Sequence, residues 1–188
     1  MNTIWFITSN RGKFQEASRK LADSKIKVVQ KNLGYPEIQA NSLEDVARFG
    51  VECLQDKVDQ PFFLEDAGLF IESLHGFPGV YSSYVYNTIG LQGILALLKK
   101  TPTSERTACF RSVIAYKEPK ESSQYFIGEC SGRITLEERG SQGFGYDPLF
   151  IPQDNSRTFA EMHTEEKNQY SHRGRSLNQL ALFLQERK

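Results

Sequence analysis

The sequence has no apolar run approaching the roughly 18 residues that a membrane span needs, and its start is too short and uncharged for a secretory signal. It has only three cysteines, widely spaced and without a CxxC pair, so zinc and dithiol redox chemistry are not indicated. Internal repeats and low-complexity segments are also missing. We therefore expect free thiols, a cytoplasmic location and no membrane partner.

An excess of charge of either sign is missing too, because 23 Lys and Arg residues balance 23 Asp and Glu residues. Non-specific nucleic-acid binding usually needs a broad positive field. An RNA-binding module is therefore disfavoured, and an anionic ligand must be met by local charge. The 188 residues, 39% of them hydrophobic, are enough for one globular domain. We expect residues 1–188 to form a single domain.

The apolar periodicity predicts helices interleaved with strands near both ends of the chain and successive strands in its middle. This order favours an α/β fold with a mixed sheet. The segment 74–84, which contains glycines and a proline, is expected to be loop-like. The expected strands are 4–8, 26–30, 62–71 with an acidic interruption, 108–116 and 125–134, and the expected helices are 14–22, 42–59, 89–100 and one that starts from Ser171.

Residues 167–175 crowd cations, a histidine and a hydroxyl into two turns, in the order Lys-Asn-Gln-Tyr-Ser-His-Arg-Gly-Arg. Clustered cations and donors near a helix start suit a bound polyphosphate. A solvated basic helix end is the alternative. Within the cluster, His172 can act as a general acid, as a reader of a base or only as a helix-start residue.

A polar turn separates the first expected strand from the first helix. The chain lacks the first glycine of GxxxxGK[ST], and Phe14 replaces its hydroxyl residue, which excludes a Walker A site. Free backbone N–H groups at this helix start, together with Thr8, Asn10 and Lys13, can still bind an anion. The alternative is a solvated turn with a surface lysine.

Glu65 and Asp66 follow three apolar residues, so at least one of these carboxylates is expected in a semi-buried cleft. Burying a carboxylate without a partner is costly, and a cation would remove that cost. Magnesium is usually held by one or two carboxylates and by substrate phosphates. Glu37 is a second ligand of this kind. The alternative places both acids in water at the end of a strand.

The segment Gly143–Pro148 combines glycines with two aromatic residues. The glycines permit close approach, and Phe144 and Tyr146 offer faces on which a base can stack. Asp147 can then meet a ring N–H. The alternative is a tight turn whose aromatic rings cap the core.

Nearly the whole chain carries a further pattern, a set of motifs in a fixed order. The motifs are Thr-Ser-Asn-Arg-Gly-Lys-Phe, Tyr-Pro-Glu-Ile-Gln, Glu-Asp-Ala-Gly-Leu-Phe-Ile-Glu, Gly-Phe-Pro-Gly-Val-Tyr-Ser-Ser, Gly-Phe-Gly-Tyr-Asp-Pro-Leu-Phe, Phe-Ala-Glu-Met and Glu-Lys-Asn-Gln-Tyr-Ser-His-Arg-Gly. This set resembles the inosine triphosphate pyrophosphatase (Ham1-like) family, and the amino-acid sequences of the motifs are most similar to those of archaeal members.

The resemblance implies an elongated mixed β-sheet flanked by helices, with two lobes around a central cleft, as in ITPase and Maf-like proteins. It also implies a homodimer, a requirement for Mg²⁺, and hydrolysis of ITP, dITP and XTP to the monophosphate and pyrophosphate. Such an enzyme removes non-standard purine nucleotides from the pool. The aromatic residues of segment 76–86 suggest the dimer interface.

Roles for single residues follow from the same resemblance. Glu37 and Asp66 would hold the metal, and we expect the Asp66 carboxylate to be catalytic by orienting or deprotonating the attacking water. The triphosphate would be held by Thr8, Asn10, Lys13 and Lys167. The base and sugar would be surrounded by Phe144, Tyr146, Asp147, Ser171, His172 and Arg173.

Two positions depart from the family pattern. Many relatives carry a lysine in the helix after Glu37, where this chain has Gly50, and Lys57 is a weak substitute. Ala67 replaces a hydroxyl residue of the acidic motif.

Two rival functions share much of the chemistry: a Maf-like pyrophosphatase acting on pyrimidine or modified nucleotides, and a nucleotide sensor without catalytic activity.

Overall fold

A computed structural model describes residues 2–36 and 38–187 of the chain. The expected α/β class is confirmed, and strands and helices alternate in the N-terminal part of the chain as predicted. The C-terminal part differs from the prediction, because two consecutive α-helices follow the last strand. The strands are β1 (Asn2–Ile7), β2 (Ile26–Lys31), β3 (Phe62–Ile71), β4 (Pro78–Gly79), β5 (Thr107–Lys117), β6 (Gln124–Ile134) and β7 (Phe150–Pro152). The α-helices are α1 (Arg11–Ala22), α2 (Leu43–Leu54), α3 (Ser82–Thr88), α4 (Gly90–Leu97), α5 (Thr164–Tyr170) and α6 (His172–Glu186).

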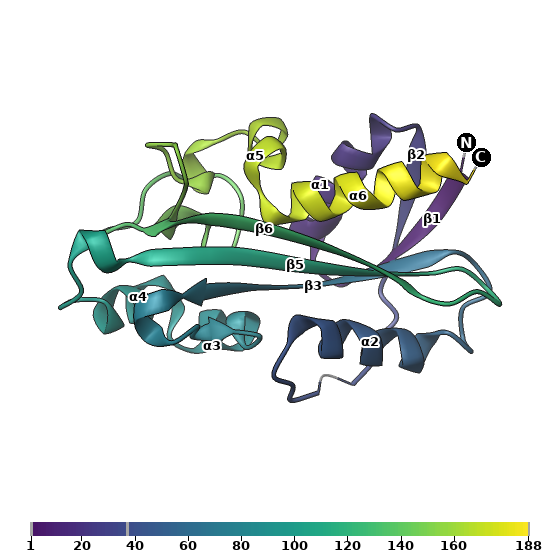
Figure 1. Cartoon of the computed structure of the whole chain (residues 1–188), viewed down its shortest axis with the longest axis horizontal. Coiled ribbons are helices and arrows are strands. Elements are labelled where there is room, and N and C mark those ends of the chain that lie inside the picture. The colour runs from purple at the N-terminus through teal and green to yellow at the C-terminus, as the bar shows by residue number, and fades with distance from the viewer. Residues whose placement is uncertain (1, 37, 188) are drawn as a thin grey trace.

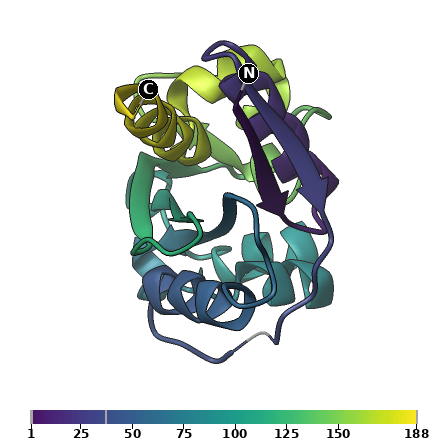
Figure 2. The same ribbon diagram turned by 90° about the vertical axis from the view of Figure 1, so that its right-hand side faces the viewer.

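The strands form one mixed sheet in the order β2-β1-β3-β5-β6-β7, with β4 paired to β3. β1 lies parallel to β2 and β3, whereas the other pairs are antiparallel. The long strands β3, β5 and β6 run along the longest axis of the molecule, which confirms the elongated sheet (Figure 1). Both views place α1, α5 and α6 on one face of the sheet and α2, α3 and α4 on the other (Figures 1 and 2).

Apolar clusters on the two faces join the helices to the sheet. On one face, β1 and β5 pack with buried residues of α1 and α6, such as Leu21 and Leu180. On the other face, α2 buries Leu43, Ala47 and Val51 against β3 and β5. The helical spacing of these residues correctly predicted which helix faces are buried. The division of residues 1–188 into two lobes stays a prediction.

Side-chain caps define where three helices begin. Asn10 Oδ1 accepts a hydrogen bond from the backbone N–H of Lys13 at 3.0 Å. Ser42 caps α2 as expected, and Ser171 Oγ accepts from the backbone N–H of Gly174 at 3.0 Å. These caps satisfy N–H groups that a helix start leaves without partners. Asn10 and Ser171 thereby fix the starts of the two helices that carry most of the predicted cations.

The segment 74–84 is loop-like only in part: residues 75–77, 80 and 81 lie in turns or irregular structure as predicted, but the rest belongs to regular elements. It contains β4 and the start of α3. The hydroxyl of Ser82 accepts from the backbone N–H of Leu69 at 2.8 Å and donates to the Gly79 carbonyl at 2.7 Å. This tertiary contact joins α3 to β3 and β4, and local periodicity does not reveal it.

Two other helix predictions also differ from the structure. Helix α2 ends at Leu54, earlier than the expected stop near residue 59. Helix α5 was not expected, because its sequence Thr-Glu-Glu-Lys-Asn-Gln-Tyr has no apolar repeat. Its buried residues, Lys167 and Asn168, are polar and enter the charged cluster described below.

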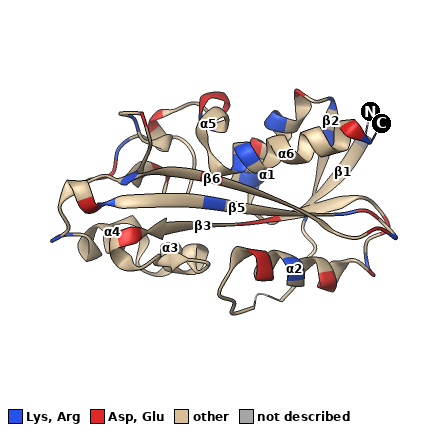
Figure 3. Cartoon of the chain, in the orientation of Figure 1, with Lys and Arg blue, Asp and Glu red and all other residues tan. Residues whose placement is uncertain are grey.

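Positive and negative residues are interleaved along the elements, in keeping with the formal net charge of +0 (Figure 3). Within residues 2–36 and 38–187, no helix is both long enough and apolar enough to cross a membrane. Several aromatic side chains around α3 are exposed, with Tyr84 at 70%.

β3 has an open edge in the middle of the sheet. β1 pairs with it only at Phe62 and Phe63, and β4 pairs with it only at Leu69 and Phe70. Among the described strands, residues 64–68 therefore pair with β5 alone. Because β1 ends at Ile7 and the chain turns into α1, side chains from several elements converge on this open edge.

Candidate functional site

A cleft of about 1230 Å³ lies over the open edge of β3. This volume lies above the upper end of the range typical of small-molecule sites. From the first strand–helix turn and β3 it is lined by Thr8, Asn10, Lys13 and Asp66. From the glycine-rich loop 143–148 and from α5 and α6 it is lined by Phe144, Tyr146, Asp147, Lys167, His172 and Arg173. The structure thus brings these expected residues together, while Ser171 is buried and is not among the lining residues, and Glu37 lies outside the described residues.

Glu65 links Lys13 at the start of α1 to Arg173 at the start of α6. The Lys13 ammonium lies 2.8 Å from Glu65 Oε2 and also donates to the Glu65 carbonyl at 3.1 Å. The Arg173 guanidinium lies 3.1 Å from Glu65 Oε1, which also accepts from the Ser112 hydroxyl at 2.8 Å. Burial alone would raise the pKa of Glu65, but Arg173 and Lys13 outweigh it and hold this pKa below its usual range. Glu65 is therefore a carboxylate at neutral pH.

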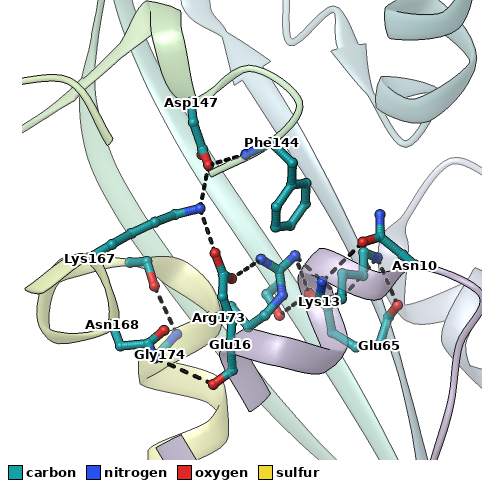
Figure 4. A network of polar contacts seen from close by, with 12 residues as sticks. Asn10, Lys13, Glu16, Glu65, Phe144, Asp147, Lys167, Asn168, Arg173 and Gly174 are labelled. Atoms are coloured by element: carbon teal, nitrogen blue, oxygen red, sulfur yellow. Dashed lines mark hydrogen bonds and ion pairs between the residues drawn. The ribbon is translucent and has the colours of Figure 1, made fainter. Parts of the chain in front are cut away.

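Glu16 links Arg173 to Lys167 on the other side of the network (Figure 4). Arg173 Nη1 donates to Glu16 Oε2 at 2.6 Å, and Lys167 Nζ donates to Glu16 Oε1 at 2.7 Å. Lys167 Nζ also donates to Asp147 Oδ2 at 2.5 Å. The buried charges thus alternate in sign along a series of ion pairs. This network joins six residues in the order Lys13, Glu65, Arg173, Glu16, Lys167 and Asp147.

Asp147 is the last residue of this network of buried ion pairs, and it holds the glycine-rich loop 143–148. Its Oδ2 atom also accepts from the backbone N–H of Phe144 at 2.8 Å. Burial raises the pKa of Asp147, and Lys167 opposes that rise. Burial would lower the pKa of Lys167, but Asp147 and Glu16 more than compensate, so this pKa is raised. The ammonium group therefore stays charged between its two carboxylate partners.

Phe144 lies over the cations of this network. Its ring centroid is 4.9 Å from Lys167 Nζ and 5.4 Å from Arg173 Cζ, within range of a cation–π contact. The ring also packs against the start of α1, since a Cβ atom at Gly12 would lie 2.5 Å from it. Gly12 thus permits the glycine-rich loop to reach the turn at the start of α1.

Tyr146 has a different environment from Phe144. Its side chain is buried, its hydroxyl donates to the Ser82 carbonyl at 2.9 Å, and its ring meets Tyr86 edge to face. For Tyr146 the core-capping alternative therefore describes the packing well, although part of the residue lines the cleft.

His172 is buried against β5. Its ring stacks on Phe110 with centroids 4.6 Å apart and an interplanar angle of 12°. Burial and the neighbouring Arg173 lower the pKa of His172 well below its usual value, although Glu65 acts in the opposite direction. The imidazole is therefore neutral at pH 7, and its Nδ1 atom has no hydrogen-bond partner among the described residues.

Asp66 points to the face opposite to Glu65, because successive side chains of a strand alternate. Glu65 reaches α1 and α6, so Asp66 faces the side that α2 and α3 cover. Asp66 is half-buried and lines the cleft there. It therefore has the exposure to the cleft that a group acting on a bound ligand needs.

Two alternatives from the sequence were wrong. The cluster 167–175 is not a solvated helix end, because Lys167, His172 and Arg173 are only 2–3% exposed. The acidic pair does not lie wholly in water, because Glu65 is buried. Sequence reasoning missed Glu16 and Ser112, whose residue types occur on any surface. The one hint was that Glu16 borders the apolar stripe of α1.

Gly50 lies in α2 and faces the core. A Cβ atom there would lie 2.8 Å from Leu64 and 3.0 Å from the ring of Tyr35. Lys57 lies beyond the end of α2 and is exposed. The ring of Tyr35 thus takes the space into which a side chain at position 50 would extend.

Comparisons with known proteins agree with this geometry. The model of the Ham1 family matches residues 4–183. A dITP/XTP pyrophosphatase of Thermococcus kodakarensis is 54% identical over 181 residues, which cover 96% of each chain. One of Pyrococcus horikoshii is 55% identical over 174 residues, covering 93% of this chain and 92% of the other. These relatives are archaeal, as the amino-acid sequences of the motifs indicated.

Solved structures show the same fold. The HAM1 protein from Coxiella burnetii superposes with a TM-score of 0.85 at 32% identity, covering 99% of this chain and 100% of the other. The Ham1 protein of Staphylococcus aureus gives a TM-score of 0.82 at 30% identity, with 100% of each chain covered.

Replacing Lys167 by Met should destabilise the fold by about 3–5 kcal/mol, because Glu16 and Asp147 would lose a buried cation. Urea denaturation at pH 7 measures this loss. Arg19→Met is the matched control, since its ion pair with Glu165 is exposed and should be worth under about 1 kcal/mol. Equal losses in the two variants would contradict the importance of the buried network.

The buried neutral His172 should make the fold less stable in mild acid. Below about pH 6.5 the unfolded chain takes up a proton on this residue and the folded chain does not, so stability falls as the pH falls. The slope from this residue is about 1.4 kcal/mol per pH unit. His172→Gln removes the titrating group, so urea denaturation between pH 7.5 and 5.5 should show a flatter dependence in the variant. Parallel curves would mean that His172 takes up its proton as readily in the folded protein as in the unfolded chain.

Proposed function

The chain belongs to the Ham1 family, and we propose that it hydrolyses non-standard purine nucleoside triphosphates to the monophosphate and pyrophosphate. The substrates are dITP, ITP and XTP, and the enzyme removes them from the nucleotide pool. The structural observation that supports this most directly is the single cleft shared by an anion-binding turn and an aromatic loop. The names of the relatives support the same reaction.

The triphosphate lies at the start of α1 in this proposal. Free N–H groups of a helix start favour phosphate, and Thr8 and Asn10 add polar side chains. Among the cations of the charged network, Lys13 is the most accessible, with 17% of its side chain exposed against 3% for Lys167 and Arg173. Lys13 is thus the lysine that contacts phosphate. Lys167 instead holds Asp147 and the loop, in place of the phosphate contact that the resemblance implied.

The nucleobase lies beside Phe144 and the start of α6 in this proposal. Hypoxanthine and xanthine carry a 6-oxo acceptor where adenine carries an amino donor. Donors from His172 and Arg173 reject adenine because they would remain unpaired beside an amino group. Guanine shares the 6-oxo group, so its 2-amino group must be excluded by crowding or by the lack of an acceptor.

Magnesium is the proposed cofactor, and the donor set near Asp66 fits it. The described residues contain no group of three or more acidic, histidine or cysteine side chains that would form an all-protein metal site. Mg²⁺ commonly binds one or two carboxylates and completes its shell with water and substrate phosphates. Asp66 would hold it, with Glu37 as the second carboxylate. When bound, the ion supplies positive charge that neutralises the phosphate oxygens.

The Asp66 carboxylate orients a water molecule and accepts its proton as the water attacks the α-phosphorus. The new bond joins the water oxygen to this phosphorus, and the bond to the bridging oxygen of pyrophosphate breaks. Lys13 stabilises the charge that develops on the leaving pyrophosphate. Positioning and electrostatics therefore supply most of the rate.

The proposal includes a homodimer in the cytoplasm. The exposed aromatic residues around α3, namely Phe77, Tyr81, Tyr84 and Tyr86, form the surface proposed for the dimer contact. Sedimentation analysis of the purified chain tests this assembly.

A substrate panel tests the activity. Pyrophosphate release from ITP, dITP, XTP, ATP and GTP should be measured with and without Mg²⁺, and only the first three are expected to be hydrolysed efficiently. Efficient hydrolysis of pyrimidine nucleotides would favour a Maf-like activity. Binding without metal-dependent release would indicate a sensor, and equal hydrolysis of ATP or GTP would contradict the proposed selectivity.

Replacing Asp66 by Asn should lower kcat for XTP by two orders of magnitude or more, since the amide cannot accept the water proton. Folding should persist, which circular dichroism can verify. Asp56→Asn is the matched control, because Asp56 is exposed beyond the end of α2. Near wild-type turnover of a folded Asp66→Asn enzyme would remove this residue from the catalytic role.

A further inference from the structure

Gly128 of β6 lies directly beneath the first turn of α6. A Cβ atom at this position would lie 2.0 Å from the His172 carbonyl oxygen and 2.6 Å from the Ser176 backbone nitrogen. Both neighbours are backbone atoms, so no side-chain rotation could relieve such a contact. The missing side chain at Gly128 therefore permits the helix to approach the sheet at this distance.

Ser112 holds the same turn from the neighbouring strand. It pairs with Gly128 across β5 and β6. Its hydroxyl lies 3.0 Å from the hydroxyl of Ser176 and donates to Glu65 Oε1 at 2.8 Å. Ser112 and Ser176 are both fully buried. Gly128 and Ser112 thus form a platform of small residues on which the start of α6 rests.

This platform determines where two side chains of the cleft lie. From the first turn of α6, the ring of His172 stacks on Phe110, and Arg173 reaches both Glu65 and Glu16. An outward shift of the turn by about 1 Å would separate the stacked rings and lengthen both ion pairs. Misplacement of this size can cost on the order of 100-fold in rate for positioned groups.

We propose that Gly128 is a positioning residue for nucleobase selection: its missing side chain seats the start of α6, and thereby places His172 and Arg173 against the base. Gly128 itself contacts no substrate. The inference rests on the proposed function. In that function the enzyme distinguishes between purine bases, and here the distance between α6 and the sheet determines how well it does so.

The test compares Gly128→Ala with Gly132→Ala. Gly132 lies on the same strand, and a Cβ there would lie 2.2 Å from the backbone oxygen of Ile151 and 2.6 Å from the ring of Phe150, with no atom of α6 among its nearest neighbours. The two variants therefore suffer similar backbone clashes at different places. The measured quantity is kcat/KM for XTP divided by kcat/KM for ATP, together with inhibition by inorganic tripolyphosphate, which probes the phosphate end alone.

In Gly128→Ala the XTP/ATP ratio should fall about 10-fold or more, through a higher KM for XTP, with tripolyphosphate inhibition changed less than about 3-fold. Gly132→Ala should change the ratio much less, because it leaves the backbone contact between β6 and α6 in place and reaches His172 only indirectly, through Phe150 and Phe110. Equal ratios in the two variants would overturn the inference. The wild-type ratio, measured in the same assay, separately decides the proposed function.

A second measurement does not depend on activity. Proton NMR of the His172 ring should show the ring-current shift from Phe110 in the wild type, and its loss in Gly128→Ala. An unchanged shift in Gly128→Ala would overturn the inference. If Gly128→Ala does not fold, Phe110→Leu is the second variant, because it removes the ring on which His172 stacks. An unchanged XTP/ATP ratio in Phe110→Leu would show that the position of His172 does not determine base selection, and would also overturn the inference.

Discussion

The alternation of charge along the buried network is the constraint on which the rest of the site depends. A carboxylate or ammonium group in a water-free site is tolerated only when it is paired and hydrogen-bonded. Glu16 meets this condition twice, because one of its oxygens binds Lys167 and the other binds Arg173. The network ties α1, α5, α6, β3 and the glycine-rich loop together across the cleft. Loss of a single charge from this network would therefore leave at least one buried partner unpaired.

The division of labour between neighbouring carboxylates follows from the pleat of β3. Glu65 and Asp66 are adjacent in sequence and so point to opposite faces of the sheet. Glu65 is enclosed by cations and has a lowered pKa, which suits a permanent anion that holds Lys13 and Arg173. Asp66 is half-buried and lines the cleft, which suits a group that handles water and an ion. One dipeptide thus supplies both the support and the proposed chemistry.

Much of the fold could be predicted from the sequence, because apolar spacing reports which faces of α1, α2 and α6 are buried. Helix α5 and the start of α3 could not, since polar residues such as Lys167 and Ser82 find their partners only in the tertiary structure. The same limit applies to the site. Motifs with unusual composition, such as Gly143–Pro148, were visible along the chain, whereas Glu16 and Ser112 acquire their importance through neighbours distant in sequence. Gly128 is a further case, because close packing of two backbones leaves no pattern in the chain.

The open edge of β3 has a consequence for how this cleft can change. Between Phe63 and Leu69 the strand has no neighbour on one side among the described strands, and the Glu65 carbonyl there already accepts a hydrogen bond from Lys13. Peptide groups along such an edge are present whatever the side chains are. Substitutions during evolution can therefore alter the rim of the cleft and its preference among ligands, while a polar floor made of main chain persists.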